Sequence, residues 1–426
     1  MSATLDPTVA PSRAVRKPLG RPFSAQLLST GLANLGDGIL GTLAPLVALS
    51  LTTSPIQISL LSAATWLPWL VFGLAAGVVI DRADRRRVQV LALGVRAAVL
   101  AAGAALGFAG ALSMPLLVTL VLVYGATEVF ADLGATSIVP DLVPSDRLSA
   151  ANGRVIGVQQ VANAFLGAPL AGALVVLGSG LGFGTSAALA ALASLVLAVG
   201  LRGDFRARAS HGSPAGAFGQ VREGLLFLAS HRVMRPLVIT SSVLNLASTA
   251  YFAVFVLWAV GPNSAMGLTP SQFPLVMLGF ALGAVAGSVL AEAVVSRLGE
   301  LPTVLTMLTS SVLLMLVPVL WPNAWAVAVA VTLVGITNTI GNVVSQSLRQ
   351  RLVPGNLLGR VGGASRTLAF GLMPLGALLG GIVAERAGLP ATFYGAVALS
   401  LAACAYLALT VRPSDIRATE RPTTAR

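Results

Sequence analysis

The stretch Gly77–Arg87, GVVIDRADRRR, decides how the chain folds, because it places a dense cluster of charge between two long apolar runs. An uncharged run, 57–80, leads into it, and a second, mostly apolar run begins at Val88. Each run has at least the ~20 residues that a helix needs to cross the hydrocarbon core of a membrane. The charged stretch must lie in water, so the sequence predicts a short hairpin between two membrane helices.

The composition favours a membrane protein over a soluble one. Of the 426 residues, 56% are hydrophobic and only 10% are charged, whereas a soluble protein carries about 25% charged residues. A net charge of +12 would suggest a nucleic-acid partner in a soluble protein. Here the positions of the basic residues give a better explanation, so we expect the lipid bilayer and no nucleic acid as a partner.

Apolar runs of membrane-spanning length recur along the whole chain. They predict an all-α polytopic membrane protein with twelve transmembrane helices in two pseudo-symmetric six-helix halves. The predicted spans are 24–50, 57–80, 88–111, 114–138, 151–177, 181–201, 236–260, 272–295, 302–321, 324–347, 359–384 and 389–411.

The basic residues predict which side of the membrane each loop occupies. With twelve spans, all but one of the 27 basic residues fall on the side that holds both termini. This count assigns Arg96 to the loop after the second span or the adjoining turns, and it counts Arg349 and Arg366 with the basic residues that follow the tenth span. Only Arg386 falls on the other side. Because cytoplasmic loops are enriched in Lys and Arg, both termini are expected on the cytoplasmic side of the membrane. We expect that membrane to be the inner membrane of a bacterium.

A polar break near the middle divides the chain. It predicts an N-terminal tail, a first half, a linker, a second half and a C-terminal tail at 1–22, 23–201, 202–235, 236–411 and 412–426. Apolar residues from Phe218 to Leu228 recur at helical spacing, which predicts an interfacial amphipathic helix within the linker. His211 and His231 also fall there and are expected to be solvated.

The two halves resemble one another at an offset of 210 residues. Gly73 and Gly77 correspond to Gly283 and Gly287, and the segment 142–144 has the same residues as 352–354. The membrane acids Glu128 and Asp132 correspond to Asn338 and Asn342. One offset shared by three separate segments indicates duplicated halves, as in transporters whose halves rock about a central site.

These features together resemble the major facilitator superfamily. They are twelve spans in two halves, a central basic linker and a G-x-x-x-D-R-x-x-R-R hairpin at Gly77–Arg87. The segments DLVPSDRLSAANG (141–153), GAPLAG (167–172), RLVPGNLLGRVGG (351–363) and PLGALLGG (374–381) are similar to the exporter branch that includes macrolide-efflux and enterobactin-exporter-like proteins. The resemblance covers residues 23–411.

The resemblance implies that the hairpin is a cytoplasmic latch. Gly73 and Gly77 would let the second span pack closely on the eleventh, and Asp81 would face the N-terminus of a helix there. The same motif contains Arg82, and Arg85 or Arg86 would connect Asp81 to an acid at the end of the fourth span. Asp141 is the first candidate for that acid.

The hairpin departs from the family pattern in two ways. Asp84 stands where a glycine is usual, and we interpret it as a surface charge rather than a second latch acid. In the second half, Asp81 and Arg82 are replaced by Ala291 and Glu292. The latch should therefore exist only once.

Acids at membrane depth are the first candidates for the transport path. Asp37 lies midway along the first span, and Glu128 lies near the middle of the fourth with Asp132 one turn later. Charges are costly there, so such residues usually face a cavity. Two neighbouring acids also suit proton coupling. The alternative is a structural ion pair with an arginine such as Arg96 or Arg154.

Further polar and aromatic residues at membrane depth are candidates for the cavity wall, although hydrogen bonding or packing between helices would explain each of them equally well. The polar candidates are Asn34, Gln159, Gln160, Asn163, Asn245, Asn338 and Asn342, and the aromatic ones are Trp66, Trp69, Tyr251, Phe252 and Phe370.

The leading functional hypothesis is a secondary active, proton-coupled exporter of small amphipathic organic compounds. No phosphate-binding G-x-x-x-x-G-K-[ST] loop occurs, which argues against ATP drive. A siderophore or secondary-metabolite exporter is the alternative within the class, and a non-transporting sensor or scaffold is the alternative outside it. We expect no enzyme activity, no cofactor and a monomer, and the single Cys404 and two histidines argue against a metal site.

Overall fold

The computed structural model describes residues 20–206, 217–354 and 357–420. Expected features at 1–19, 207–216 (with His211) and 421–426 lie outside the described residues. Within the described part, twelve helical spans are long and apolar enough to cross a membrane. The helices are α1 (Arg21–Leu51), α2 (Pro55–Arg82), α3 (Arg85–Phe108), α4 (Met114–Leu142), α5 (Leu148–Gln160), α6 (Ala168–Leu177), α7 (Ser179–Gly200), α8 (Ala217–Ser230), α9 (Met234–Ala259), α10 (Gln272–Leu298), α11 (Glu300–Leu314), α12 (Val317–Leu320), α13 (Ala324–Leu352), α14 (Leu358–Gly371), α15 (Met373–Ala387), α16 (Leu389–Thr410) and α17 (Pro413–Glu420).

Three of the twelve spans are interrupted rather than straight. The fifth contains the short helix η1 (Ser145–Arg147), α5, a π-helical segment η2 (Val161–Gly167) and α6. The ninth consists of α11 and α12, and the eleventh of α14 and α15. In both of the latter, a proline in the first turn of the second piece cannot donate a backbone N–H, which explains the break.

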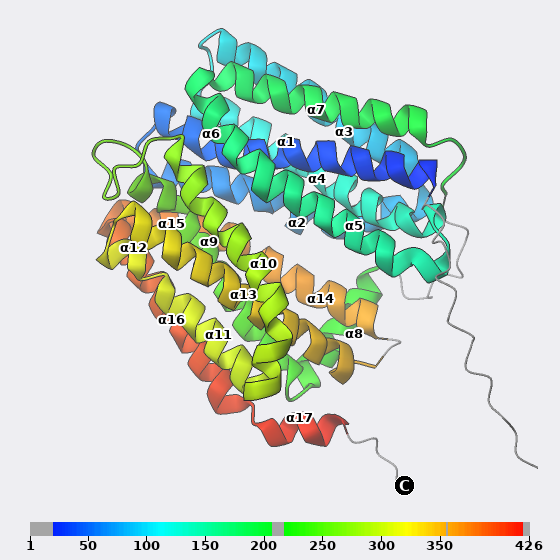
Figure 1. Ribbon diagram of the computed structural model, residues 1–426, viewed down its shortest axis with the longest axis vertical. Coiled ribbons are helices and arrows are strands. Elements are labelled where there is room, and N and C mark those ends of the chain that lie inside the picture. Colours follow the sequence, from blue (N-terminus) through cyan, green and yellow to red (C-terminus); the bar gives the residue numbers. More distant parts are fainter. Residues whose placement is uncertain (1–19, 207–216, 355–356, 421–426) are drawn as a thin grey trace, which may run out of the picture.

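The spans form two bundles, α1–α7 and α9–α16, as the repeat predicts (Figure 1). We call the end of the molecule where α1 begins and α17 lies the basic end, and the opposite end the far end. The halves contact each other toward the far end, where α2 packs on α9 and α15, and α6 packs on α10. Figure 1 shows the same two bundles diverging toward the basic end, on the right.

A polar clasp joins the halves at the far end. Glu385, near the end of α15, accepts hydrogen bonds through Oε2 from Ser54 Oγ (3.1 Å) and from the backbone N–H of Ile56 (3.4 Å) in the first turn of α2. A Cβ placed on Gly381 would clash with the Ser59 side chain, so the two helices touch backbone to side chain here. A carboxylate at a helix N-terminus is favoured by the free N–H groups and the helix dipole.

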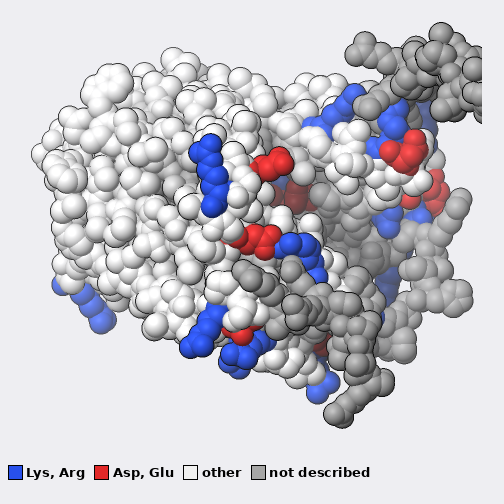
Figure 2. Space-filling view, turned by 60° about the horizontal axis from the view of Figure 1, so that its bottom comes forward, with Lys and Arg blue, Asp and Glu red and all other residues white. Residues whose placement is uncertain are grey.

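Toward the basic end, α2 has open space beside two of its glycines. A Cβ placed on Gly73 or on Gly77 would meet no atom within 4 Å. Their counterparts Gly283 and Gly287 instead pack tightly inside the second half, against the α13 backbone at Thr332 and Ile336. The cleft between the halves is therefore open at the basic end. Figure 2 shows charged side chains gathered toward this end, on the right.

The helix α8 lies in the linker, within the range where an amphipathic helix is expected. It packs on α14, where Glu223 pairs with Arg360 at 2.6 Å and Leu228 is buried. His231 follows it and is not simply solvated: its Nδ1 accepts from the backbone N–H of Val233 (3.2 Å) and of Met234 (3.1 Å). Burial lowers the pKa of His231, which favours the neutral ring that this N-terminal cap of α9 requires.

Candidate functional site

Asp37 and Arg96 form an ion pair inside the first half. Arg96 Nη1 lies 2.6 Å from Asp37 Oδ1, and only 3% of the arginine side chain and 13% of the aspartate side chain are exposed. The Tyr124 hydroxyl donates to the same carboxylate oxygen, and the Tyr124 ring lies 4.8 Å from the guanidinium carbon. Arg96 Nε also donates to Thr127 Oγ1 at 3.3 Å. The cluster joins α1, α3 and α4.

This arrangement corrects the placement of Arg96 in a loop. The residue lies well inside α3, within the apolar segment VLALGVRAAVLAAG (90–103), and its charge is neutralised by Asp37. The ion pair is the alternative that the sequence left open for Asp37. Arg154 does not serve this role: it lies exposed on α5.

A close helix crossing fixes the position of Asp37. The adjacent Gly38 touches the backbone of Asn163 so closely that a Cβ would clash with its carbonyl oxygen. On the other side of the crossing, a Cβ on Gly167 would lie 2.7 Å from the Gly38 Cα. Asn163 and Gly167 both belong to the π-helical segment η2, and such segments are frequent at functional sites. The backbone contact holds α1 in register beside the acids.

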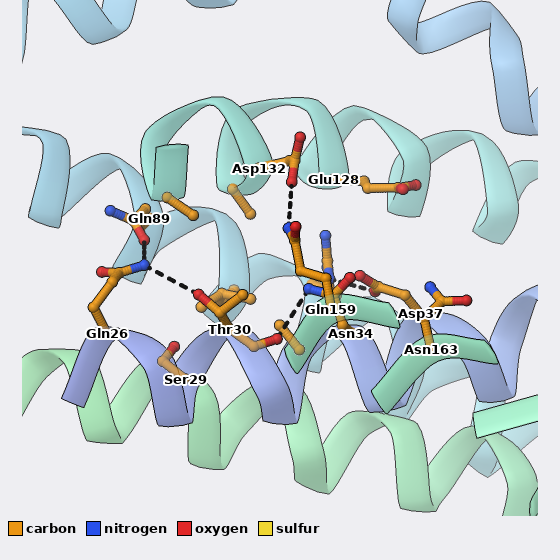
Figure 3. A pocket seen from close by; sticks show the side chains of 15 residues that line it. Gln26, Ser29, Thr30, Asn34, Asp37, Gln89, Glu128, Asp132, Gln159 and Asn163 are labelled. Atoms are coloured by element: carbon orange, nitrogen blue, oxygen red, sulfur yellow. Dashed lines mark hydrogen bonds and ion pairs between the residues drawn. The ribbon is translucent and has the colours of Figure 1, made fainter. Parts of the chain in front are cut away.

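Glu128 and Asp132 lie on successive turns of α4, facing α1 across a pocket (Figure 3). Asp132 accepts a hydrogen bond from Gln159 Nε2 at 3.3 Å. Glu128 is half-buried, and no hydrogen bond or ion pair joins it to the part of the chain that the structure describes. The pocket of about 70 Å³ also includes Asp37, so it collects all three membrane acids.

The other polar candidates separate into two groups. Asn34, Gln159 and Asn163 line the acidic pocket, whereas Asn245 and Asn342 line a second cavity in the other half. Asn338 lines neither; its Oδ1 accepts from Asn342 Nδ2 at 2.8 Å. Sequence reasoning missed Gln26, Thr30 and Gln89, which form a hydrogen-bonded chain beside the acids. Gln26 and Thr30 lie one turn apart on α1, but Gln89 belongs to α3, and its hydrogen bond to Gln26 is a long-range contact that sequence spacing does not show.

A third cavity, of about 430 Å³, lies between the halves toward the far end. Asp37, Glu128 and Trp66 line it from the first half, and Phe252 and Phe273 from the second. Trp66 and Trp69 also flank Phe370 across the interface, with ring centroids 5.9 and 6.0 Å away. Tyr251 is not a wall residue: it is buried among aromatic rings and donates to the Met315 carbonyl at 2.9 Å.

The charged hairpin is held within the first half. Arg85 pairs with Asp141 at 2.6 Å, and Arg86 donates to the carbonyl of Ala198 at the end of α7, also at 2.6 Å. Asp84 is buried rather than a surface charge, because it caps α3 by accepting from the Arg86 N–H at 2.9 Å. Arg82 is exposed, and the Asp81 side chain lies outside the described part.

The sequence matches a known family along nearly its whole length. Residues 18–424 match the family described as transmembrane secretion effector. The chain is similar to "Multidrug efflux pump Tap" of Mycobacterium tuberculosis strain H37Rv, with 30% identity over 86% of this chain and 88% of that one. It is also similar to "Macrolide efflux protein A" of Streptococcus pyogenes, with 22% identity over 79% of this chain and 83% of that one.

Solved structures share the fold at low sequence identity. The nucleoside transporter NupG has a TM-score of 0.70 at 13% identity, covering 92% of this chain and 99% of that one. A bacterial homologue of the lysosomal transporter Spinster has a TM-score of 0.71 at 15% identity, covering 95% of this chain and 98% of that one.

Proposed function

This chain belongs to the transmembrane secretion effector family of major facilitator transporters, and on that premise we propose that it exports small amphipathic organic compounds by alternating access. The observation that carries the proposal is the cavity of about 430 Å³ between the halves. It combines aromatic walls from both halves with carboxylates from one, which suits a ligand that has an apolar body and a polar or cationic group.

The open cleft at the basic end would be the entrance for substrate. We infer that this end faces the cytoplasm, because the arginines at the helix ends and linker gather on it. Substrate would enter there, and the halves would then close at the basic end and separate at the far end. The clasp of Glu385 on α2 must break in that step.

Proton coupling is the finer part of the proposal, and Glu128 is our choice for the carrier. Asp37 already has a permanent partner in Arg96, so its charge is neutralised without a proton. Glu128 faces the same cavity without an ion-pair partner among the described residues, and an unpaired charge at membrane depth is costly. Taking up a proton removes that cost, so protonation and closure of the cavity would be linked, with Asp132 as the neighbouring acid.

The test is transport by the purified protein in proteoliposomes with a labelled macrolide. An imposed proton gradient should drive uptake by the wild type, whereas Glu128→Gln should lose gradient-driven uptake and keep macrolide exchange at zero gradient. Glu292→Gln, which alters an exposed acid outside the central cavity, is the matched control and should behave as wild type. Gradient-driven uptake by Glu128→Gln would remove Glu128 from coupling, and absence of uptake by the wild type would count against export.

A further inference from the structure

The second half contains a polar cavity of about 220 Å³ with a strongly basic lining. It lies among α9, α13 and α14, beside the cleft that opens at the basic end. Arg349 and Arg366 belong to its wall, and no aspartate or glutamate does. Arg349 donates to the neighbouring Gln346, and neither arginine forms an ion pair with the described residues. No carboxylate among the described residues therefore balances the positive charge of this cavity through an ion pair.

Two buried hydroxyl groups in the same wall have no hydrogen-bond partner. Ser242 is 6% exposed and Ser365 is 7% exposed, and the Oγ atoms of both lack a partner among the described residues. A buried polar group without a partner is costly, so such groups usually mark a place where something else binds. The two serines come from α9 and α14 and face the cavity that contains the arginines.

The opposite half provides the complementary charge. The acidic pocket has Asp37, Glu128 and Asp132 in its wall, and Arg96 neutralises only one of them. Arg366 also attracts Asp132 electrostatically, although the two form no ion pair. Arg366 lines the pocket between the halves as well, together with Trp69 and Phe370. Arg366 and Phe370 thus line both the basic cavity and the pocket between the halves.

We propose that Arg349, Arg366, Ser242 and Ser365 form an anion subsite that binds the carboxylate or phosphate group of an amphipathic substrate. This inference rests on the proposed export function and adds to its substrates a class that the subsite would bind more tightly, compounds that carry an anionic group, zwitterions above all. In a zwitterion, the cationic group would face the acids of the first half while the anionic group binds the second half.

The chemistry of the four groups fits an oxyanion. A guanidinium presents two parallel N–H donors that match the two oxygens of a carboxylate or phosphate. Each serine hydroxyl adds one donor and regains a hydrogen bond on binding. Two arginines near each other repel, as Arg349 and Arg366 do here, and an anion between them relieves that repulsion. A zwitterion bound in this way would contact both halves, through its anionic group in the second half and its cationic group in the first.

The experiment compares two dyes that differ by one charge. Tetramethylrhodamine is a zwitterion with a free carboxylate, and its methyl ester is a cation of nearly the same shape. Binding of each dye to the full chain is measured by fluorescence polarisation in nanodiscs of phosphatidylcholine. The wild type should prefer the zwitterion. Arg366→Gln and Arg349→Gln should each weaken zwitterion binding about ten-fold and leave ester binding unchanged.

Control variants separate the subsite from general effects of charge or folding. Arg360 belongs to α14, as Arg366 does, but it pairs with Glu223 outside the cavity. The variant Arg360→Gln should therefore bind both dyes as the wild type does. Arg366→Lys retains the charge but loses the paired donors, so its zwitterion affinity should fall between wild type and Arg366→Gln. Thermal unfolding of each variant shows whether it is folded.

Two results with the wild type would overturn the subsite: equal binding of the two dyes, or no binding of either dye. Two results with the arginine variants would also overturn it: equal losses of affinity for both dyes, or unchanged binding of the zwitterion. Adding phosphatidylglycerol to the nanodiscs tests the source of the anion. Loss of the zwitterion preference on this addition would assign the cavity to a lipid headgroup instead. Export of the ester in proteoliposomes tests the proposed function separately, because the ester has no anion to bind.

Discussion

The Arg96 guanidinium lies 2.6 Å from the Asp37 carboxylate and neutralises it inside the first half. Because both side chains are mostly buried, removing one partner would leave the charge of the other poorly solvated. The middle of α4, YGATEVFADLG (124–134), contains no arginine. Here an arginine from α3 contacts the same region, so the charge balance of the half depends on a residue in a different helix.

A double-mutant cycle tests this dependence. Arg96→Leu should destabilise the protein by about 3–5 kcal/mol, since it leaves the Asp37 charge buried and unpaired. Combining it with Asp37→Asn should recover most of that loss, because the uncompensated charge is then gone. Thermal unfolding in detergent gives the ranking of the four proteins. A double mutant no more stable than Arg96→Leu alone would show that the pair is not coupled.

Replacing Gly77 tests whether α2 must close against the other half. Gly77→Leu meets open space in this conformation, so we expect an unchanged unfolding temperature. The added bulk should block closure at the basic end, lower export at least ten-fold and increase labelling of an introduced Gly363→Cys in a Cys404→Ala background. Normal export by Gly77→Leu would exclude a close approach of α2 at this position.

The repeat supplies the control for this substitution. Gly287, the counterpart of Gly77, lies where a Cβ would be 2.6 Å from the Ile336 carbonyl oxygen. Gly287→Leu should therefore force α10 and α13 apart and destabilise the fold by about 1–3 kcal/mol. The same change at equivalent positions should thus impair motion in one half and stability in the other.

The Glu385 clasp predicts a shift in conformational balance. Glu385→Ala removes both acceptor contacts to the start of α2, and a carboxylate at a helix N-terminus stabilises by up to about 1 kcal/mol. That free energy corresponds to a roughly five-fold increase in the population open at the far end. Labelling of Ser62→Cys by a membrane-impermeant maleimide added at the far end measures it. Arg386→Ala is the neighbouring control and should leave the labelling rate unchanged.

His231 predicts a pH dependence of stability. Burial lowers its pKa below the ordinary value of about 6.5, so the unfolded chain binds a proton more readily than the folded one. The contribution of the cap is complete above pH ~6.5 and is lost as the pH falls through the folded pKa. His231→Asn supplies a cap that does not titrate. Its unfolding temperature should decrease less than that of the wild type between pH 7 and pH 5; parallel curves would contradict the cap.

The sequence predicts the spans well and the pairing of buried charges poorly. Runs of apolar residues set where helices cross, so α2, α4 and α10 begin within two residues of their expected starts. The count of basic residues assigned Arg96 to the cytoplasmic side because it treats every arginine as part of a loop or an adjoining turn, although Arg96 falls within the predicted span 88–111. One arginine within an otherwise apolar run was the available signal, since burying it requires an acid from another helix.

The cavity walls could be predicted only in part. Polar residues at membrane depth identify Asn34, Asn163 and Asn245 as wall residues, but which half-cavity each one joins depends on helix packing. The basic character of the second-half cavity was not foreseen either. Arg349 lies near the end of α13 and Arg366 lies within α14, and only the packing of both helices beside α9 brings the two side chains to one cavity.

The open space beside Gly73 also has a pharmacological consequence. A pocket of about 190 Å³ lies there, between Trp69 and Leu70 of one half and Gly363 and Phe370 of the other. The halves must fill this space themselves when they close. A small molecule wedged into it would arrest the cycle without occupying the acidic pocket, and because Arg366 lines this pocket too, it would compete with the anionic group of a substrate.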